Sequence, residues 1–157
     1  MATTPRYAGT TVAAAKTYVS EMLGTDTFLR VFDLDGDGVV ATSSADETSF
    51  VRAVCAAETE IDEALGASSG APFTGTIPDS IREITAQRCL WCAVRFRLGM
   101  SDAARAPYRL LYLDTDARLK RIAQDDRARI PEKGPSAPTS QLAASVEYAD
   151  SFWGDTE

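Results

Sequence analysis

Residues 44–65 read SADETSFVRAVCAAETEIDEAL, and this stretch predicts a long helix. Ser44 offers a side-chain cap, and Glu47 follows three residues later, which is the capping-box pattern of a helix start. The apolar residues after it recur at steps of four, three, four and four, namely at Phe50, Val54, Ala57, Ile61 and Leu65. Such steps place side chains on one face of a helix. We therefore expect an amphipathic helix that ends at about Leu65-Gly66.

Four other segments have the spacing of apolar residues that is typical of helices: residues 12–23, 26–32, 81–98 and 102–124. Thr11 and Gly24 are typical of the residues that cap the first of these. The segment 81–98 is apolar on nearly all sides in its second half, which predicts a central helix. Pro107 disfavours a helical residue before it, so we expect a kink or a restart there. The apolar stripe of the last segment is Tyr108, Leu111, Tyr112, Leu119 and Ile122.

The chain of 157 residues has the length of a single domain. Proline and glycine become frequent after residue 130, at Pro131, Gly134, Pro135 and Pro138. We therefore expect a helical domain over residues 1–130 and a proline-tethered tail over residues 131–157. This tail either folds back on the domain or binds another chain through its aromatic residues, Tyr148, Phe152 and Trp153.

A loop rich in aspartate and glycine lies between two apolar runs and reads VFDLDGDGVV over residues 31–40. It fills the first, third, fifth and sixth positions of the EF-hand pattern for calcium with Asp33, Asp35, Asp37 and Gly38. The twelfth position is Ser44, so the bidentate glutamate that closes such a loop is missing. Two interpretations remain. The aspartates either cap neighbouring amides in a turn, or form a weak calcium site of millimolar-class affinity in which Asp46 or Glu47 replaces the missing ligand.

Charge and composition exclude several classes of function. Sixteen basic and twenty-three acidic residues give a net charge of −7, which argues against non-specific binding of nucleic acid through its phosphates. No run of apolar residues is long enough for a membrane span, and the first residues lack the apolar core of a signal peptide. We therefore expect a soluble protein of intracellular origin that does not bind a membrane.

Catalysis is not expected, because no catalytic base, nucleophile or cofactor motif is visible. The chain has no histidine, which removes every His-dependent triad. Cys89 and Cys92 form a C-x-x-C motif inside an apolar helical run, which favours buried core residues over a zinc site. A cluster of acidic residues on the long helix is either a solvated face or a functional acidic surface: Glu58, Glu60, Asp62 and Glu63. The arginines of the next apolar segment are expected to pair with that helix or to extend to solvent.

These segments together resemble the family of head-tail connector, or adaptor, proteins of tailed phages and Mu-like prophages. The resemblance runs from about Ala13 to Ile130. It rests on the loop DLDGDG over residues 33–38 before a long helix, on AAETEIDEAL over residues 56–65, and on the glycine-proline loop that ends at Pro78. It continues through the helix from Ile81 to Leu98, and Arg105-Ala106-Pro107-Tyr108 leads the final helix.

The resemblance implies an all-α fold, a small bundle of about four to five helices with the acidic-glycine loop and an extended C-terminal tail. It implies a structural virion protein in the neck between capsid and tail, made in the bacterial cytoplasm. Such adaptors form rings, usually twelve-fold, with copies of themselves below the portal protein. They contact the next neck or tail component, extend the DNA channel without binding DNA specifically, and are not enzymes.

The ring implies a channel wall that repels phosphate, and part of the set Glu58, Glu60, Asp62 and Glu63 is the candidate lining. The alternative function is a calcium-binding, EF-hand-like regulatory module. No cofactor other than a possible weakly bound calcium ion is expected.

Overall fold

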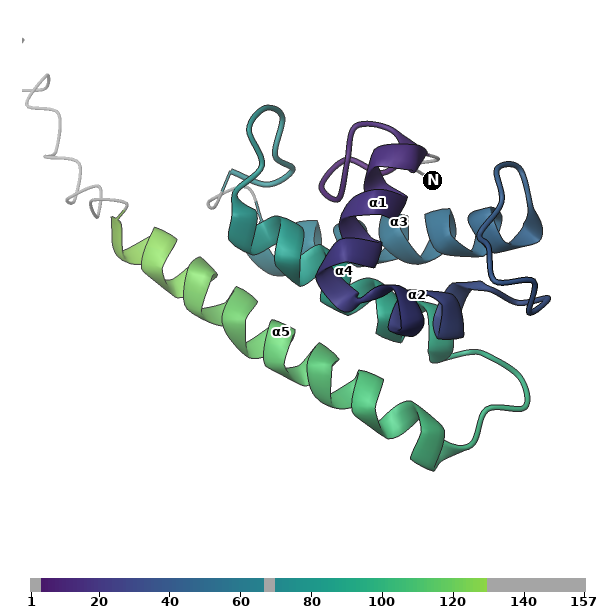
Figure 1. Cartoon of the computed structure of the whole chain (residues 1–157). Coiled ribbons are helices and arrows are strands. Elements are labelled where there is room, and N and C mark those ends of the chain that lie inside the picture. Colours follow the sequence, from purple (N-terminus) through teal and green to yellow (C-terminus); the bar gives the residue numbers. More distant parts are fainter. Residues whose placement is uncertain (1–3, 67–69, 130–157) are drawn as a thin grey trace, which may run out of the picture. The chain divides into compact units, whose positions relative to one another are not determined.

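The computed structural model describes residues 4–66 and 70–129, and in these residues the fold is all-α. It contains five helices: α1 (Val12–Leu23), α2 (Thr25–Phe32), α3 (Ala45–Leu65), α4 (Asp79–Val94) and α5 (Asp102–Arg129) (Figure 1). The expected small helical bundle is confirmed. The chain divides into two units, Met1–Arg127 and Ala128–Glu157, and the description that follows concerns the first. The predicted tail, residues 131–157, lies outside the described residues.

Side-chain caps set the starts of α1 and α3 where the sequence predicts them. The Thr11 hydroxyl accepts a hydrogen bond from the amide of Ala14, 3.1 Å away. The Ser44 hydroxyl accepts one from the amide of Glu47 at 3.1 Å, and the Glu47 carboxylate accepts one from the amide of Ser43 at 2.9 Å. These bonds satisfy amides that have no partner within the helix.

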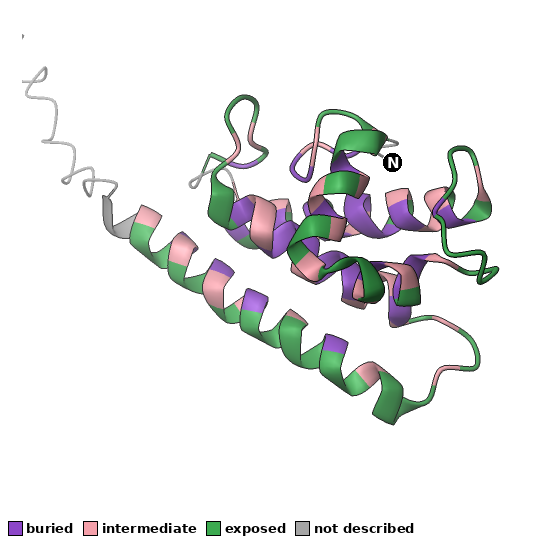
Figure 2. Ribbon diagram, viewed as in Figure 1, coloured by how far each residue is buried: buried purple, intermediate pink, exposed green. Residues whose placement is uncertain are grey.

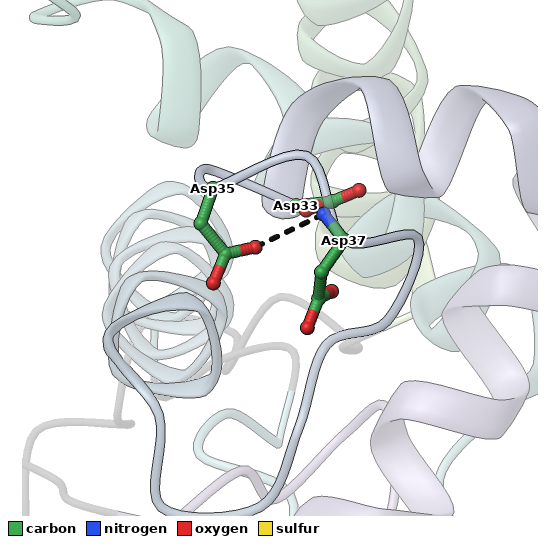
Figure 3. A group of neighbouring side chains, drawn as sticks. All are labelled: Asp33, Asp35 and Asp37. Atoms are coloured by element: carbon green, nitrogen blue, oxygen red, sulfur yellow. Dashed lines mark hydrogen bonds between the residues drawn. The ribbon is translucent and has the colours of Figure 1, made fainter.

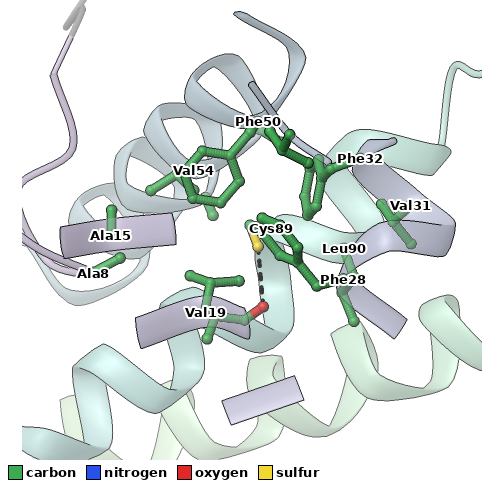
Figure 4. Close-up of a cluster of buried hydrophobic side chains, with 14 of the residues drawn as sticks. Ala8, Ala15, Val19, Phe28, Val31, Phe32, Phe50, Val54, Cys89 and Leu90 are labelled. Atoms are coloured by element: carbon green, nitrogen blue, oxygen red, sulfur yellow. Dashed lines mark hydrogen bonds between the residues drawn. The ribbon is translucent and has the colours of Figure 1, made fainter. Parts of the chain in front are cut away.

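The main hydrophobic core lies where α1 and α2 meet the α3–α4 pair, the most closely packed helices of the bundle (Figure 4). Its centre is a trio of rings, Phe28, Phe32 and Phe50, whose centroids are 5.2 to 5.6 Å apart. Tilted and edge-on ring pairs of this kind contribute about 0.5–1.5 kcal/mol each beyond the burial of their area. Every member of the predicted α3 stripe is buried, as expected for the face that carries the core.

A second cluster of buried residues joins the N-terminal segment, α3, α4 and the later turns of α5. It comprises Tyr7, Ile61, Leu65, Ala71, Ile81, Ile84, Leu119 and Ala123. One face of α5 is therefore anchored. The backbone of α5 stays farther from α4 than that of α3 does, because large side chains fill the space between them. Trp91 packs on Tyr112 with ring centroids 6.0 Å apart, and the guanidinium of Arg88 lies 4.2 Å from the same tyrosine ring.

Two predicted helix boundaries were wrong. Helix α4 ends at Val94 instead of Leu98, and Phe96 and Leu98 are 81% and 96% exposed. The helix ends there because Val94 is its last residue that packs in the core. Arginines then hold the loop that follows. Arg97 donates to the carbonyl of Val31 at 3.1 Å, and Arg105 donates to the carbonyl of Arg97 at 2.6 Å.

Helix α5 runs without a break through Pro107 and extends to Arg129, five residues past the predicted end at Gln124. Pro107 lies beyond the first four amides of α5, so its ring leaves one intrahelical hydrogen bond unmade, the one to the carbonyl of Ala103, and the rest of the helix continues. The predicted stripe is partly correct. Tyr108 and Leu119 are buried and Tyr112 and Ile122 are half-buried, but Leu111 is 38% exposed.

Candidate functional site

The acidic loop between α2 and α3 brings its three aspartates together, as the EF-hand pattern requires (Figure 3). One carboxylate oxygen of each of Asp33, Asp35 and Asp37 lies within 4.8 Å of the others. Among the described residues, this is the one group of three or more potential ligands that could hold a metal ion. Hard oxygen ligands at this spacing suit Ca²⁺ or Mg²⁺ better than a transition metal.

The loop carboxylates also hold the turn together through backbone amides. Both oxygens of Asp33 accept hydrogen bonds, from the amides of Gly36 and Gly38 at 2.8 Å each. Asp35 accepts from the amide of Asp37 at 3.2 Å, and Asp37 accepts from that of Val39 at 2.8 Å. Gly36 and Gly38 have φ of +79° and +81°, the left-handed region that favours glycine. These contacts are those expected of turn-forming aspartates.

The two residues proposed to replace the missing calcium ligand are engaged elsewhere. Asp46 is buried and accepts from the amide of Leu34 at 3.2 Å. Glu47 caps the start of α3 with one oxygen and pairs with Lys16 through the other at 2.6 Å. The Lys16 ammonium, followed by the amide of Ser43, lowers the pKa of Glu47. Neither side chain is free to close the loop around an ion in this conformation.

The surroundings of the loop shift the pKa values of its first two aspartates in opposite directions. Burial raises the pKa of Asp33, but the amides of Gly38 and Gly36 together outweigh it, and the net shift is downward. For Asp35 the amide of Asp37 lowers the pKa, but desolvation and the nearby carboxylates of Asp37 and Asp46 raise it by more. A bound cation would relieve the repulsion among these carboxylates.

The acidic cluster on α3 is used largely inside the molecule. Glu58 is fully buried and accepts from the amides of Arg6 and Tyr7 at 2.8 Å each. Asp62 pairs with the Arg6 guanidinium at 2.7 Å and accepts a short hydrogen bond from the Tyr7 hydroxyl. That hydroxyl in turn accepts from the amide of Phe73 at 3.1 Å. Two carboxylates one helical turn apart thus fasten the N-terminal segment to α3.

Glu60 is the partner of Arg88 in α4 and of Arg95, the residue that follows α4. It lies 3.0 Å from the guanidinium of Arg88 and 2.6 Å from that of Arg95, which confirms the expectation that these arginines pair with the acidic helix. Of the four candidate channel-lining residues, Glu63 alone is exposed. The lumenal role predicted for part of this set stays a prediction, and in this conformation Glu63 is the member that can face solvent.

A groove of about 1050 Å³ follows the side of α3 that faces away from the core. Apolar residues with small or medium side chains line it, namely Val51, Cys55 and Ala56. Charged residues of both signs also line it, including Arg52, Glu63 and Arg95. The thiol of Cys55 is not activated there, because burial raises its pKa. The groove thus has apolar and charged lining residues but no nucleophile paired with a base.

Of the two cysteines of the C-x-x-C motif, Cys89 lies in the core and Cys92 is half-buried against it. Cys89 is fully buried and its thiol lies 3.1 Å from the carbonyl of Ala86. Burial raises the pKa of Cys89 well above its ordinary value, and burial, with the Glu60 carboxylate next, raises that of Cys92 to about 12. Redox or nucleophilic reactivity needs a thiolate, and the raised pKa values keep both thiols protonated at neutral pH.

Helix α5 has a second apolar face that was not predicted from the sequence. Its members are all exposed and recur at steps of three and four residues: Ala103, Ala106, Leu110, Leu113 and Ala117. The signal was present as a heptad pattern, but alanine is a weak marker of burial. Tyr148, Phe152 and Trp153, the predicted partner-binding residues of the tail, lie outside the described residues.

No family model, curated protein or solved structure matches this chain. Within the described residues, each helix is too short or too polar to cross a bilayer.

Proposed function

We propose that the chain is a structural protein of the tailed-phage neck. In this proposal it is a head-tail adaptor that forms a ring below the portal, extends the DNA channel and joins capsid to tail. Its partners are the portal protein, the next neck or tail component, and copies of itself. The sequence resemblance is the reason for proposing this class of protein, and the small all-α bundle is the fold that the resemblance implies.

The observation that carries an assembly role is the apolar surface left uncovered by the bundle. Phe96 and Leu98, in the loop between α4 and α5, are almost fully exposed although the domain has two buried clusters of its own. Exposed aromatic and aliphatic side chains close together in the chain are typical of surfaces that bind another protein. A role as a passive solvated domain would not require them.

The charge of the chain is consistent with a channel component. The net charge of −7 would repel phosphate, and copies arranged in a ring would repeat every exposed carboxylate around the passage. Of the predicted lining set, Glu63 is exposed and Glu60 and Asp62 are half-buried, and Asp35 and Asp37 of the acidic loop are further exposed carboxylates. DNA would then pass without adhering to the wall.

The test is to mix the purified chain with the portal protein of the same phage and to examine the product by electron microscopy and mass measurement. We expect a stoichiometric ring complex. The double variant Phe96→Ser/Leu98→Ser should bind less well, whereas Met22→Ser, an exposed apolar residue of α1, should bind normally. Failure of the wild-type chain to bind portal, together with virions that lack it at the neck, would refute the proposal.

A calcium-responsive module is the second candidate, and the clustered aspartates are the observation that favours it. Because Asp33, Asp46 and Glu47 already accept hydrogen bonds or pair with lysine, we expect at most millimolar affinity. Calcium at about 0.1 mM should then leave the melting temperature unchanged. Isothermal titration that gave a micromolar Kd, abolished in Asp35→Asn, would instead support the regulatory function.

A further inference from the structure

The exposed face of α5 has the geometry of a coiled-coil seam. Its apolar residues follow one another at steps of three, four, three and four, the a and d positions of a heptad. The two leucines at its centre, Leu110 and Leu113, are 68% and 51% exposed, and alanines flank them on both sides. Figure 2 shows exposed positions along the side of α5 that turns away from α4, and buried positions on the side that turns toward it. We call Ala103, Ala106, Leu110, Leu113 and Ala117 the outer stripe.

Charged residues flank the outer stripe in a complementary pattern. If Ala103 is an a position, Arg109 and Asp116 are g positions, and Asp114 and Arg121 are e positions. In a parallel, in-register pair of helices each g side chain lies beside the e side chain of the next heptad on the other helix. Arg109 would then meet Asp114 of a second copy, and Asp116 would meet Arg121. Both pairs join opposite charges, and the two-fold symmetry repeats each of them.

An antiparallel pair uses this pattern less well. There g residues face g residues and e residues face e residues, so Arg109 meets Asp116, while Asp114 lies near the uncharged Pro107. Asp116 is already paired with Lys120 at 2.8 Å, which weakens its contact in either arrangement, whereas Arg109 and Asp114, which meet only in the parallel pair, have no ion pair among the described residues. The charges therefore favour the parallel arrangement.

We propose that a second copy of this chain docks on the outer stripe, in a parallel α5–α5 contact. The leucines form the central layers, and the alanines allow close approach at both ends. Lys120 and Gln124, which continue the heptad as polar residues, end the apolar seam and help to fix its register. The same surface serves both copies, so the contact closes at two, whereas a ring needs head-to-tail contacts between different surfaces. This inference therefore goes beyond the proposed function and does not rest on it.

The test is sedimentation equilibrium of the full chain over a range of concentrations. We expect the mass to rise with concentration from 16.9 kDa toward twice that value. Leu113→Glu should weaken the dimer by more than about tenfold, because it places a charge in the central layer. Leu34→Glu, which changes an exposed leucine of the acidic loop, should leave it unchanged. Circular dichroism of both variants checks that the helices persist.

Orientation is tested by oxidative cross-linking of Ala106→Cys, a d position. A parallel pair brings the two new thiols together, so this variant should form a covalent dimer alone. An antiparallel pair would cross-link only when Ala106→Cys is mixed with Ala117→Cys, and that outcome would overturn the proposed arrangement. A chain that remains a monomer at every concentration, for instance because residues 130–157 cover the stripe, would overturn the proposal itself. So would a dimer that Leu113→Glu leaves intact. Portal binding is measured separately, so the two proposals can fail independently.

Discussion

Glu58 is a buried carboxylate whose partners are mainly backbone amides. It accepts from the amides of Arg6 and Tyr7, and the Arg6 guanidinium lies 3.5 Å away. A buried charge is tolerated only where hydrogen bonds and opposite charge replace its hydration. The N-terminal segment supplies those partners, so its attachment to α3 depends on Glu58.

Replacing Glu58 by glutamine should therefore destabilise the protein. The substitution keeps the size of the side chain, but removes the charge and puts an NH2 group in the place of Oε2, where the amide of Arg6 and the Arg6 guanidinium, both donors, would face it. We expect the free energy of unfolding, measured in urea, to fall by about 3 kcal/mol. Glu63→Gln, on the exposed face of the same helix, should change it by less than about 0.5 kcal/mol. Equal effects of the two substitutions would contradict the buried role of Glu58.

Tyr7 makes the stability depend on alkaline pH. Desolvation, followed by its hydrogen bond to Asp62, raises the pKa of Tyr7 to about 12. A group whose pKa is higher in the folded state stabilises the fold below its unfolded pKa, near 10, and this contribution is lost as pH rises toward 12. Between pH 10 and 12 the wild type should lose about 2–3 kcal/mol more of its unfolding free energy than Tyr7→Phe does. Parallel curves for the two proteins would rule this contribution out.

At the scale of elements, the acidic loop is a turn whose conformation depends on glycine. Its aspartates bond to amides two, three or five residues further along the chain, which requires the backbone to reverse within a few residues. Gly38 makes this possible with φ of +81°, and space is not the constraint, since a Cβ there would meet no heavy atom within 4 Å.

Gly38→Ala should thus destabilise the protein through backbone strain alone, by about 1–2 kcal/mol. The matched control is Gly75→Ala, where a Cβ also has open space but φ lies outside the left-handed region. That substitution should be neutral or slightly stabilising, since alanine restricts the unfolded chain. Thermal unfolding of both variants measures the difference. Loss of stability at Gly75 but not at Gly38 would contradict the strain argument.

The two faces of helix α5 differ in burial. Tyr108, Thr115, Leu119 and Ala123 are buried against the bundle, while the outer stripe is exposed. Contact with the bundle covers only one side of a helix, so a helix that is apolar on two sides keeps one apolar side uncovered. The bundle thus completes its own core and still presents an apolar surface.

At the scale of the whole helical unit, two buried clusters hold the helices together. The larger one joins α1, α2, α3 and α4 and also includes Ala8 and Tyr108, and the smaller one ties the N-terminal segment and the later turns of α5 to the α3–α4 pair. Because α5 approaches α4 less closely than α3 does, its attachment depends on a few large side chains instead of continuous backbone packing. Leu119 is the fully buried leucine of α5 in this cluster.

Leu119→Ala should consequently lower the free energy of unfolding by about 2–5 kcal/mol, the usual cost of removing a buried leucine side chain. Leu110→Ala, on the opposite face of the same helix, should cost less than about 1 kcal/mol in dilute solution. Urea unfolding at low protein concentration, where no dimer contributes, is the appropriate measurement. A large loss at Leu110 would mean that the outer stripe is part of the core.

Local patterns along the chain predict the starts of α1 and α3, the buried stripe of α3 and the clustering of the three aspartates. They suffice because a cap, a helical face and a short turn involve residues within a few positions of one another. The ends of α4 and α5 were predicted wrongly, and of the two alternatives expected at Pro107 the restart does not occur. The end of α4 depends on whether side chains find distant partners, as Arg97 finds the carbonyl of Val31, and local preference alone does not contain that information.

For the acidic residues on α3, too, the sequence predicts one part and the packing of the helices decides the rest. Composition and spacing identify Glu58, Glu60, Asp62 and Glu63 as a charged cluster, since they lie within two turns of one helix. Folding assigns the first three to ion pairs and hydrogen bonds with Arg6, Tyr7, Arg88 and Arg95, and leaves Glu63 to solvent. Those partners are 28 to 56 residues away along the chain, so their pairing is a property of the packed helices and not of any single segment.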